Sequence, residues 1–226
     1  MIKIENTDVY GWEAAVRGMR NPKNSWKLSD SLFASDCVAY DKTVGGEPVN
    51  LGNNDLRLMK SLAKSGSDHG KFLRMINVTV DITAPLYWWK EFDTYKVGTV
   101  ANSCSTMHKL TAKEFTMDDF SHEHLTGEGE SILAYVIDNM NAVRGLYLKY
   151  DEKKETIEQM FPTKKDAWWQ MIQLLPSSYN QKRTVQLNYE VLRNIHHARR
   201  KHKLDEWLDF CIWCEGLPYF KEICLK

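Results

Sequence analysis

The clearest hydrophobic pattern in this chain lies between residues 76 and 85. Apolar residues occupy every second position, at Ile76, Val78, Val80 and Ile82, and polar residues fill the positions between them. Side chains on a strand point alternately to opposite faces. The pattern therefore predicts a strand with one buried face that ends near Pro85.

Elsewhere, apolar residues recur every three or four positions, which is the spacing of a helix face. This spacing predicts helices over Val9–Met19, from a capping Asn54 to Gly66, over Ser131–Tyr150 and over about 164–175. The acidic segment 112–130 is expected to be a loop, and the last third of the chain is expected to be mostly helical. Residues 31–53 show no pattern that favours one element.

One helical stretch in the last third carries polar groups on its apolar face. At about 100° per residue, the following side chains fall within roughly 80° of arc: Asn188, Leu192, Ile195, Arg199 and His202. A face that packs only in a core does not begin and end with hydrogen-bonding groups. The pattern favours a helix along a partly buried polar pocket, with Asn188 and Arg199 facing the same way.

Length and charge limit the classes of function. The 226 residues, 43% of them hydrophobic, suit one domain over residues 1–226. Thirty basic and thirty acidic residues give a net charge of zero, so no overall field attracts nucleic acid. No apolar run approaches the roughly 20 residues of a membrane helix, and residues 1–6 lack a signal core. We expect a cytoplasmic protein with no nucleic-acid or membrane partner.

The five cysteines do not indicate a disulfide framework, because their number is odd and their spacing irregular. Cys211 and Cys214 form a Cys-x-x-Cys pair. On a helix this spacing more often places two buried thiols on one face than two ligands of a zinc ion. We expect no metal site.

Two stretches resemble the flavin-dependent thymidylate synthases. The first runs from His69-Gly70-Lys71-Phe72 through the strand, Ala84-Pro85 and a Trp pair to Asn102-Ser103-Cys104-Ser105. That family has a His, a strand, Ala-Pro and the signature Arg-His-Arg-x-x-Ser-x-Asn-x-x-Ser-x-Arg-Tyr in this order. The second is similar to the family's Leu-Pro turn followed by two Asn and an Arg, here Leu175-Pro176, Asn188, Asn194 and Arg199.

The resemblance implies an α+β fold with an antiparallel sheet and flanking helices, assembled as a homotetramer. It implies FAD as the cofactor and the reductive methylation of dUMP to dTMP. Methylenetetrahydrofolate supplies the carbon in that family, and reduced flavin supplies the hydride.

The resemblance also implies roles for individual residues. The positions that match the family's cofactor-binding residues are His69, Lys96, Thr99, Asn102, Asn188 and Asn194. Ser105 and Arg199 match positions that act on the substrate, and Arg199 would face the uracil edge. The register before Ser105 stays open, since an alignment without an insertion places Cys104 at the second Ser of the signature.

The chain departs from the family where arginines bind phosphate. The Arg-His-Arg positions read Thr94, Tyr95 and Lys96, and later arginines are replaced by Met107, Ile172 and Glu190. Each lost charge-assisted hydrogen bond is worth about 1.5–3 kcal/mol. Two alternatives therefore remain: a flavin-dependent thymidylate synthase, or a flavin- or nucleotide-binding homologue of the same fold that lacks catalysis.

Overall fold

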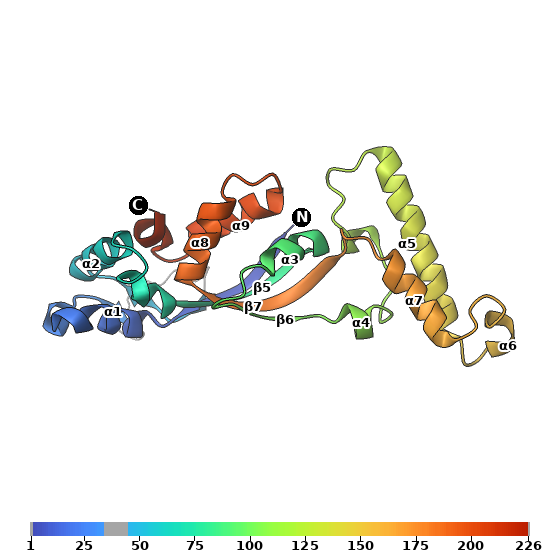
Figure 1. Ribbon diagram of the computed structural model, residues 1–226, viewed down its shortest axis with the longest axis horizontal. Coiled ribbons are helices and arrows are strands. Elements are labelled where there is room, and N and C mark those ends of the chain that lie inside the picture. Colours follow the sequence, from blue (N-terminus) through green and yellow to red (C-terminus); the bar gives the residue numbers. More distant parts are fainter. Residues whose placement is uncertain (1, 34–44, 226) are drawn as a thin grey trace. The chain divides into compact units, whose positions relative to one another are not determined.

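The computed structural model describes residues 2–33 and 45–225, which form two compact units (Figure 1). The α8 unit comprises residues 2–82, 92–102 and 183–226, and the α5 unit comprises residues 83–91 and 103–182. Each is named here after one of its helices. Cys37, one of the five cysteines, lies outside the described residues.

A five-stranded sheet has the order β3-β1-β5-β7-β6. Its strands are β1 (Lys3–Tyr10), β3 (Gly45–Gly46), β5 (Asn77–Pro85), β6 (Val100–Ser103) and β7 (Asn180–Asn188). A separate antiparallel pair joins β2 (Leu32–Phe33) to β4 (Val49–Asn50).

The five-stranded sheet is mixed, which corrects the expectation of an antiparallel sheet. β1 pairs with β3 in parallel. β5 and β7 run in opposite directions, because the backbone N–H of Tyr189 bonds the carbonyl of Ile76 at one end and the N–H of Leu86 bonds the carbonyl of Tyr179 at the other. The α+β class is as expected, and β5 is the predicted strand, with Val78, Val80 and Ile82 buried.

In the described part of the α8 unit, the apolar residues are buried under helical elements, of which six have five residues or more. These are α1 (Trp12–Arg20), α2 (Asn53–Lys64), α8 (Tyr189–Arg199), α9 (Asp205–Gly216), the 3-10 segment Gly70–Arg74 and the π-helical turn Lys221–Leu225. Trp12 is fully buried, and its ring meets that of Tyr189 edge-on with centroids 5.4 Å apart. The aromatic content of the sequence is thus used largely for the core.

Helix α1 begins at Trp12 rather than at Val9, because Val9 belongs to β1. Gly11 makes the turn between them with a φ of 89°, and a Cβ atom there would lie 2.1 Å from the carbonyl oxygen of Met75. Only glycine fits this position. The cap of α2 is also corrected: Gly52 is its N-cap and Asn54 lies inside the helix.

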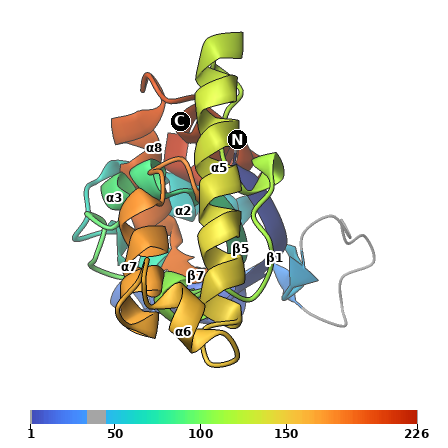
Figure 2. The ribbon, with the colours of Figure 1, turned by 90° about the vertical axis from the view of Figure 1, so that its right-hand side faces the viewer.

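The α5 unit is built mainly from helices. They are α3 (Leu86–Phe92, of which Phe92 belongs to the α8 unit), α4 (Thr106–Lys109), α5 (Gly127–Leu148), α6 (Lys154–Ile157) and α7 (Lys164–Leu174). Figure 2 shows α5 lying beside α7, and they enclose a core that includes Leu133, Ile137, Met140 and Met171. Helix α5 starts four residues before the predicted Ser131, since Thr126 caps it.

Candidate functional site

The candidate site lies in the α8 unit, where Tyr95 meets Arg199. Tyr95 follows α3, in the loop that leads to β6, and Arg199 is the last residue of α8. The Nε of Arg199 donates a hydrogen bond of 2.9 Å to the hydroxyl oxygen of Tyr95. Leu192 and Ile195, the apolar residues of the same helix face, are fully buried, so this part of α8 packs into the core.

Aromatic rings support the Arg199 guanidinium. Its central carbon lies 4.8 Å from the ring centroid of Trp207 and 5.6 Å from that of Tyr95. Trp207, on α9, is fully buried and stacks on Phe92 with an interplanar angle of 16°. A cation over the face of a ring is attracted by the ring quadrupole. Arg199 is therefore held in one orientation by a hydrogen bond and two rings.

The loop between α3 and β6 lines a cavity of about 370 Å³. Its lining residues are Phe92, Asp93, Tyr95, Lys96, Thr99 and Ala101. The Oγ1 of Thr99 is buried and has no hydrogen-bond partner among the described residues. Buried polar atoms are normally paired, so this hydroxyl is suited to a polar group of a ligand. The carboxylate of Asp93 is bonded to Arg183 at 2.7 Å.

Asn188 has a role that the helical projection did not predict. It lies at the end of β7 and is the N-cap of α8, where its side-chain oxygen accepts a hydrogen bond from the N–H of Val191 at 3.1 Å. Gly98 of the cavity loop packs against it: a Cβ on Gly98 would lie 3.0 Å from Nδ2 of Asn188. Asn188 thus joins α8 to the loop that carries Lys96 and Thr99, and its oxygen is already used by the helix.

The remaining predicted residues do not gather around Arg199. His69 is exposed beside the 3-10 segment that starts at Gly70. Asn194 is exposed and lines a different cavity of about 480 Å³, together with Lys64, Arg193 and His197. Desolvation lowers the pKa of His197, and the nearby Arg200 lowers it further. Asn194 is thus beside a group of basic side chains.

Asn102 and Ser105 lie on either side of the boundary between the units. Asn102 is exposed on β6. Ser105 belongs to the α5 unit, is partly buried and directly precedes α4, and its carbonyl accepts a hydrogen bond from the N–H of Lys109, the last residue of that helix. The residues that the structure brings together are therefore Lys96 and Thr99 around the cavity, Tyr95 with Arg199, and Asn188 through Gly98.

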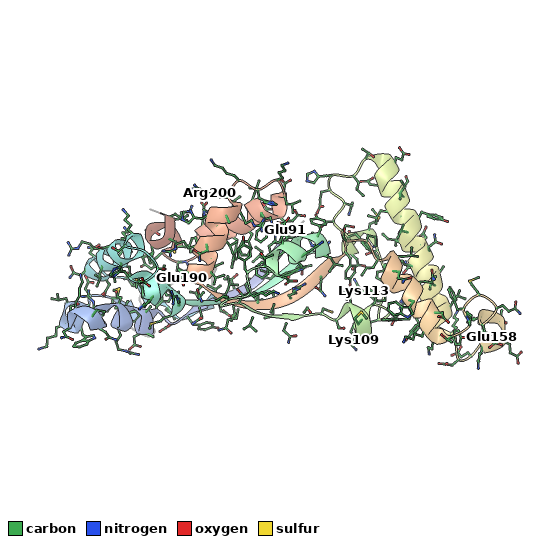
Figure 3. All side chains as sticks on the ribbon, in the orientation of Figure 1. Glu91, Lys109, Lys113, Glu158, Glu190 and Arg200 are labelled. Atoms are coloured by element: carbon green, nitrogen blue, oxygen red, sulfur yellow. The ribbon has the colours of Figure 1, made fainter. Side chains whose placement is uncertain are left out.

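The residues that stand where the family has arginines have other surroundings in this chain. Ile172 packs against the core of the α5 unit, and Met107 is 48% exposed. Glu190, labelled in Figure 3 near the start of α8, forms an ion pair with Arg74 and lies 4.0 Å from a guanidinium nitrogen of Arg193. The carboxylate of Glu190 thus pairs with two arginines of the protein, and it lacks the N–H donors with which an arginine binds a phosphate.

Sequence reasoning missed Trp207, Asp93 and the pairing of Tyr95 with Arg199. Trp207 stands eight residues after Arg199 and belongs to the next helix, so no helical spacing links the two. Tyr95 was noted only as the replacement of the family's His. Its hydrogen bond joins it to a residue more than a hundred positions away, which no local sequence pattern predicts.

A flavin or a nucleotide fits part of this site. The unpaired hydroxyl of Thr99 and the ammonium group of Lys96 are chemically suited to polar and anionic ligand atoms. The rings around Arg199 give the site apolar walls. The phosphate-binding arginines of the family's signature are absent, so Lys96 is the cation in the described lining of this cavity.

The Cys211–Cys214 pair is buried. Cys211 and Cys214 lie on α9 and are buried, and burial raises the pKa of Cys211 to about 11 and that of Cys214 well above its usual value. In the described part of the chain, no three His, Cys, Asp or Glu side chains gather as a metal site would require. The helices of residues 2–33 and 45–225 include none with the length and apolar character needed to cross a bilayer.

Comparisons with known proteins test the resemblance. No protein-family model matches the chain, and no curated protein matches its sequence. A crystal structure of thymidylate synthase X from Helicobacter pylori with FAD and dUMP matches with a TM-score of 0.64, at 14% identity over 100% of this chain and 98% of that one. A second structure of the same flavin-dependent enzyme, complexed with FAD and dUMP, gives 0.62 at 17% identity over 99% and 100%. The chain therefore has the fold of the flavin-dependent thymidylate synthases, as its two sequence stretches suggest.

Proposed function

We propose that this chain is a flavin-dependent thymidylate synthase-like protein that binds FAD and dUMP, as a cytoplasmic homotetramer. The observation that carries the proposal is the full-length likeness to thymidylate synthase X with both ligands bound. The second support is local. The cavity beside Arg199 offers a buried unpaired hydroxyl and a lysine within the same loop.

The candidate reaction is the reductive methylation of dUMP to dTMP with methylenetetrahydrofolate. FAD, when bound and reduced, would supply a hydride. In this proposal Lys96 and Thr99 bind polar atoms of the cofactor or nucleotide. The fixed charge of Arg199 would stabilise negative charge on the pyrimidine edge, because its orientation is set before the ligand arrives. Ser105, His69, Asn102 and Asn194 remain candidates for direct contact, and Asn188 acts by fixing the loop.

A second candidate is a flavin- or nucleotide-binding homologue without catalysis. The contacts of Arg199 favour it, since Nε is bonded to Tyr95 and the guanidinium lies on Trp207. The apolar Met107 and Ile172 favour it as well. On these grounds we expect dTMP formation to be weak or absent even where FAD and dUMP bind.

One pair of assays separates the two candidates. Binding of FAD and dUMP is measured by calorimetry, and dTMP formation is measured with dUMP, methylenetetrahydrofolate and NADPH. Binding without turnover supports the second candidate. Turnover that is lost on Arg199→Ala would support the enzyme and would show that other cations have replaced the arginines. If the protein bound neither FAD nor dUMP, both candidate functions would be contradicted.

The homotetramer has its own support and its own test. Large apolar side chains are exposed along α5, with Ile132 60% and Tyr135 70% accessible in the single chain. Such residues are typical of surfaces that pair with another protein. Light scattering at micromolar concentration should give four times the chain mass, and a monomer mass would contradict the assembly.

A further inference from the structure

Another cavity, of about 380 Å³, lies within the α8 unit, between the segment that follows α1 and helix α2. Its polar lining residues are Arg20, Lys23, Ser25, Asn54, Arg57 and Ser61. The volume is within the range of about 300–1,000 Å³ that small-ligand sites occupy. The cavity shares no lining residue with the one proposed for FAD and dUMP.

A buried ion pair fixes one wall of this cavity. The Nε of Arg20 lies 2.6 Å from Oδ1 of Asp55, and both side chains are almost fully buried. The terminal nitrogens of the same guanidinium donate hydrogen bonds to the carbonyls of Ser25 and Leu28, at 3.1 and 3.0 Å. A buried polar network in which the groups are paired rigidifies its surroundings. The segment 20–28 is therefore held in place without a ligand.

Helix α2 supplies another wall. Asn54, Arg57 and Ser61 are three and four residues apart, so they share one face of the helix. Nη2 of Arg57 donates a hydrogen bond of 2.8 Å to Oδ1 of Asn54. This bond holds the guanidinium toward the start of α2 and leaves its other N–H groups available. The face that α2 turns to the cavity is thus polar and cationic.

The cavity carries positive charge that the protein does not neutralise. No acidic residue is among its described lining residues, and in the described part of the chain none pairs with Lys23 or Arg57. The carboxylate of Asp30 is bonded to two backbone N–H groups in the first turn of α2, so it serves that helix end. Two cations from two different elements therefore line one cavity without a counter-ion from the protein.

The uncharged part of the lining limits the kind of anion. Its apolar residues are Leu28 and Leu58, and no aromatic side chain is among the described lining residues. A flavin or a nucleobase has no ring to stack on here. The hydroxyl of Ser61 and the amide of Asn54 are donors for oxygen atoms of a ligand. The chemistry suits a compact oxyanion that takes several hydrogen bonds.

Lysine and arginine are the side chains that bind phosphate groups with charge-assisted hydrogen bonds. We infer that this cavity binds a small phosphate that carries no aromatic ring, either the free anion or the monoester of an aliphatic alcohol. Lys23 and Arg57 are its cationic contacts. The ligand and the site are both separate from those of the proposed function.

Calorimetry on the full-length protein in phosphate-free buffer tests this site with glycerol phosphate and glycerol, which differ only in the phosphate. Wild-type protein should bind glycerol phosphate and not glycerol. Lys23→Gln/Arg57→Gln should weaken that binding by about tenfold or more, as expected for lost charge-assisted contacts. Lys27→Gln/Lys60→Gln is the matched control, since it removes the same charge from the same segment and helix at residues that do not line the cavity.

Inorganic phosphate as a third probe distinguishes the two sources. Binding equal to that of glycerol phosphate assigns the site to the free anion, and weaker binding assigns it to the ester. The inference is overturned if wild-type protein binds neither phosphate, if glycerol binds as tightly as its phosphate, or if both double variants weaken binding equally.

Ser61→Asp is a second, independent variant, because it places a carboxylate in the lining without removing a cation. It should abolish the binding of glycerol phosphate, and retained binding in a variant that circular dichroism shows to be folded would overturn the inference. FAD retention is measured on the same proteins. Arg199→Ala should reduce FAD and leave glycerol phosphate binding unchanged, and Lys23→Gln/Arg57→Gln should do the reverse, so either proposal can fail while the other stands.

Discussion

Arg199 donates a hydrogen bond from Nε to the hydroxyl oxygen of Tyr95, across 2.9 Å. The resemblance to the flavin-dependent thymidylate synthases aligns both residues with functional positions, a His of the signature and a substrate-facing Arg. In this chain they contact each other, and the cation of Arg199 also lies over the ring of the buried Trp207. The pair fixes the charge of Arg199 in one place, and it uses one of the donors that a ligand would need.

Arg199→Ala should weaken FAD or dUMP binding by roughly 1–3 kcal/mol, because a charged hydrogen-bonding group is lost. Arg200→Ala is the control. Arg200 is the exposed C-cap of α8 and is labelled in Figure 3. Calorimetry measures ligand binding by both variants. Equal effects of the two substitutions would mean that the end of α8 is only a basic surface.

Tyr95→Phe removes the hydroxyl and keeps the ring. The free energy of unfolding should fall by about 0.5–1.5 kcal/mol, the usual net value of one hydrogen bond. Urea denaturation of Tyr95→Phe, Arg199→Ala and the double variant forms a thermodynamic cycle. The two single effects should not add. Strict additivity would show that the hydrogen bond contributes nothing to the stability of the site.

Asp55→Ala should destabilise the protein by about 3–5 kcal/mol, since it leaves the buried Arg20 without its partner. Both side chains are almost fully buried, and Nε of Arg20 lies 2.6 Å from Oδ1 of Asp55. Glu13→Ala is the control, because the Glu13–Arg17 pair is exposed and contributes about 0.5 kcal/mol or less. A loss as small as that of the control would contradict the role of Asp55.

The same carboxylate predicts a pH dependence. Burial on its own would raise the pKa of Asp55, but hydrogen bonds from Ser31, Ser29 and Arg20 lower it below the ordinary value of 3.8. A lowered pKa means that the stabilisation is present above the unfolded-state pKa and is lost as the pH falls through the folded-state pKa. Acid titration of wild-type protein should therefore show a loss of stability below about pH 4, and Asp55→Ala should show a smaller one.

Three cysteines should resist alkylation at pH 8. Burial raises the pKa of Cys211 to about 11 and that of Cys224 to about 12, and Cys214 is fully buried. The thiolate is the reactive form, so these thiols are both unreactive and covered. Peptide mass spectrometry after iodoacetamide should find Cys104, which is exposed, modified in native protein. Labelling of Cys214 at the same rate would contradict the burial of α9.

Elements with a strong and local signal were predicted from the sequence. Strand β5 and helix α7 have nearly the predicted ends, because alternation and a helical face that stops before a proline are local properties. Strands β1 and β7 were missed. β7 reads Asn-Gln-Lys-Arg-Thr-Val-Gln-Leu-Asn, and only Val185 and Leu187 of its residues carry a clear apolar alternation. Its place is set by pairing with strands distant in the sequence, which no local pattern encodes.

The candidate site, too, was predicted only in part. Lys96, Thr99 and Arg199 were named from the resemblance, and the structure places them around one loop and one helix end. The helical projection of Asn188 failed because the chain changes from strand to helix at that residue, so an angle per residue no longer applies. The position of Trp207 against Arg199 depends on the turn between α8 and α9, and no local sequence pattern predicts the path of that turn.

Retention of FAD is the property on which the proposed function depends most directly. Purified protein is incubated with FAD, passed through a desalting column and examined by its absorption spectrum, with Arg199→Ala and Arg200→Ala treated in parallel. We predict a flavin band that stays with wild-type protein and with Arg200→Ala, and that is reduced in Arg199→Ala. A protein that elutes without flavin, at FAD concentrations that saturate ordinary flavoproteins, would contradict it.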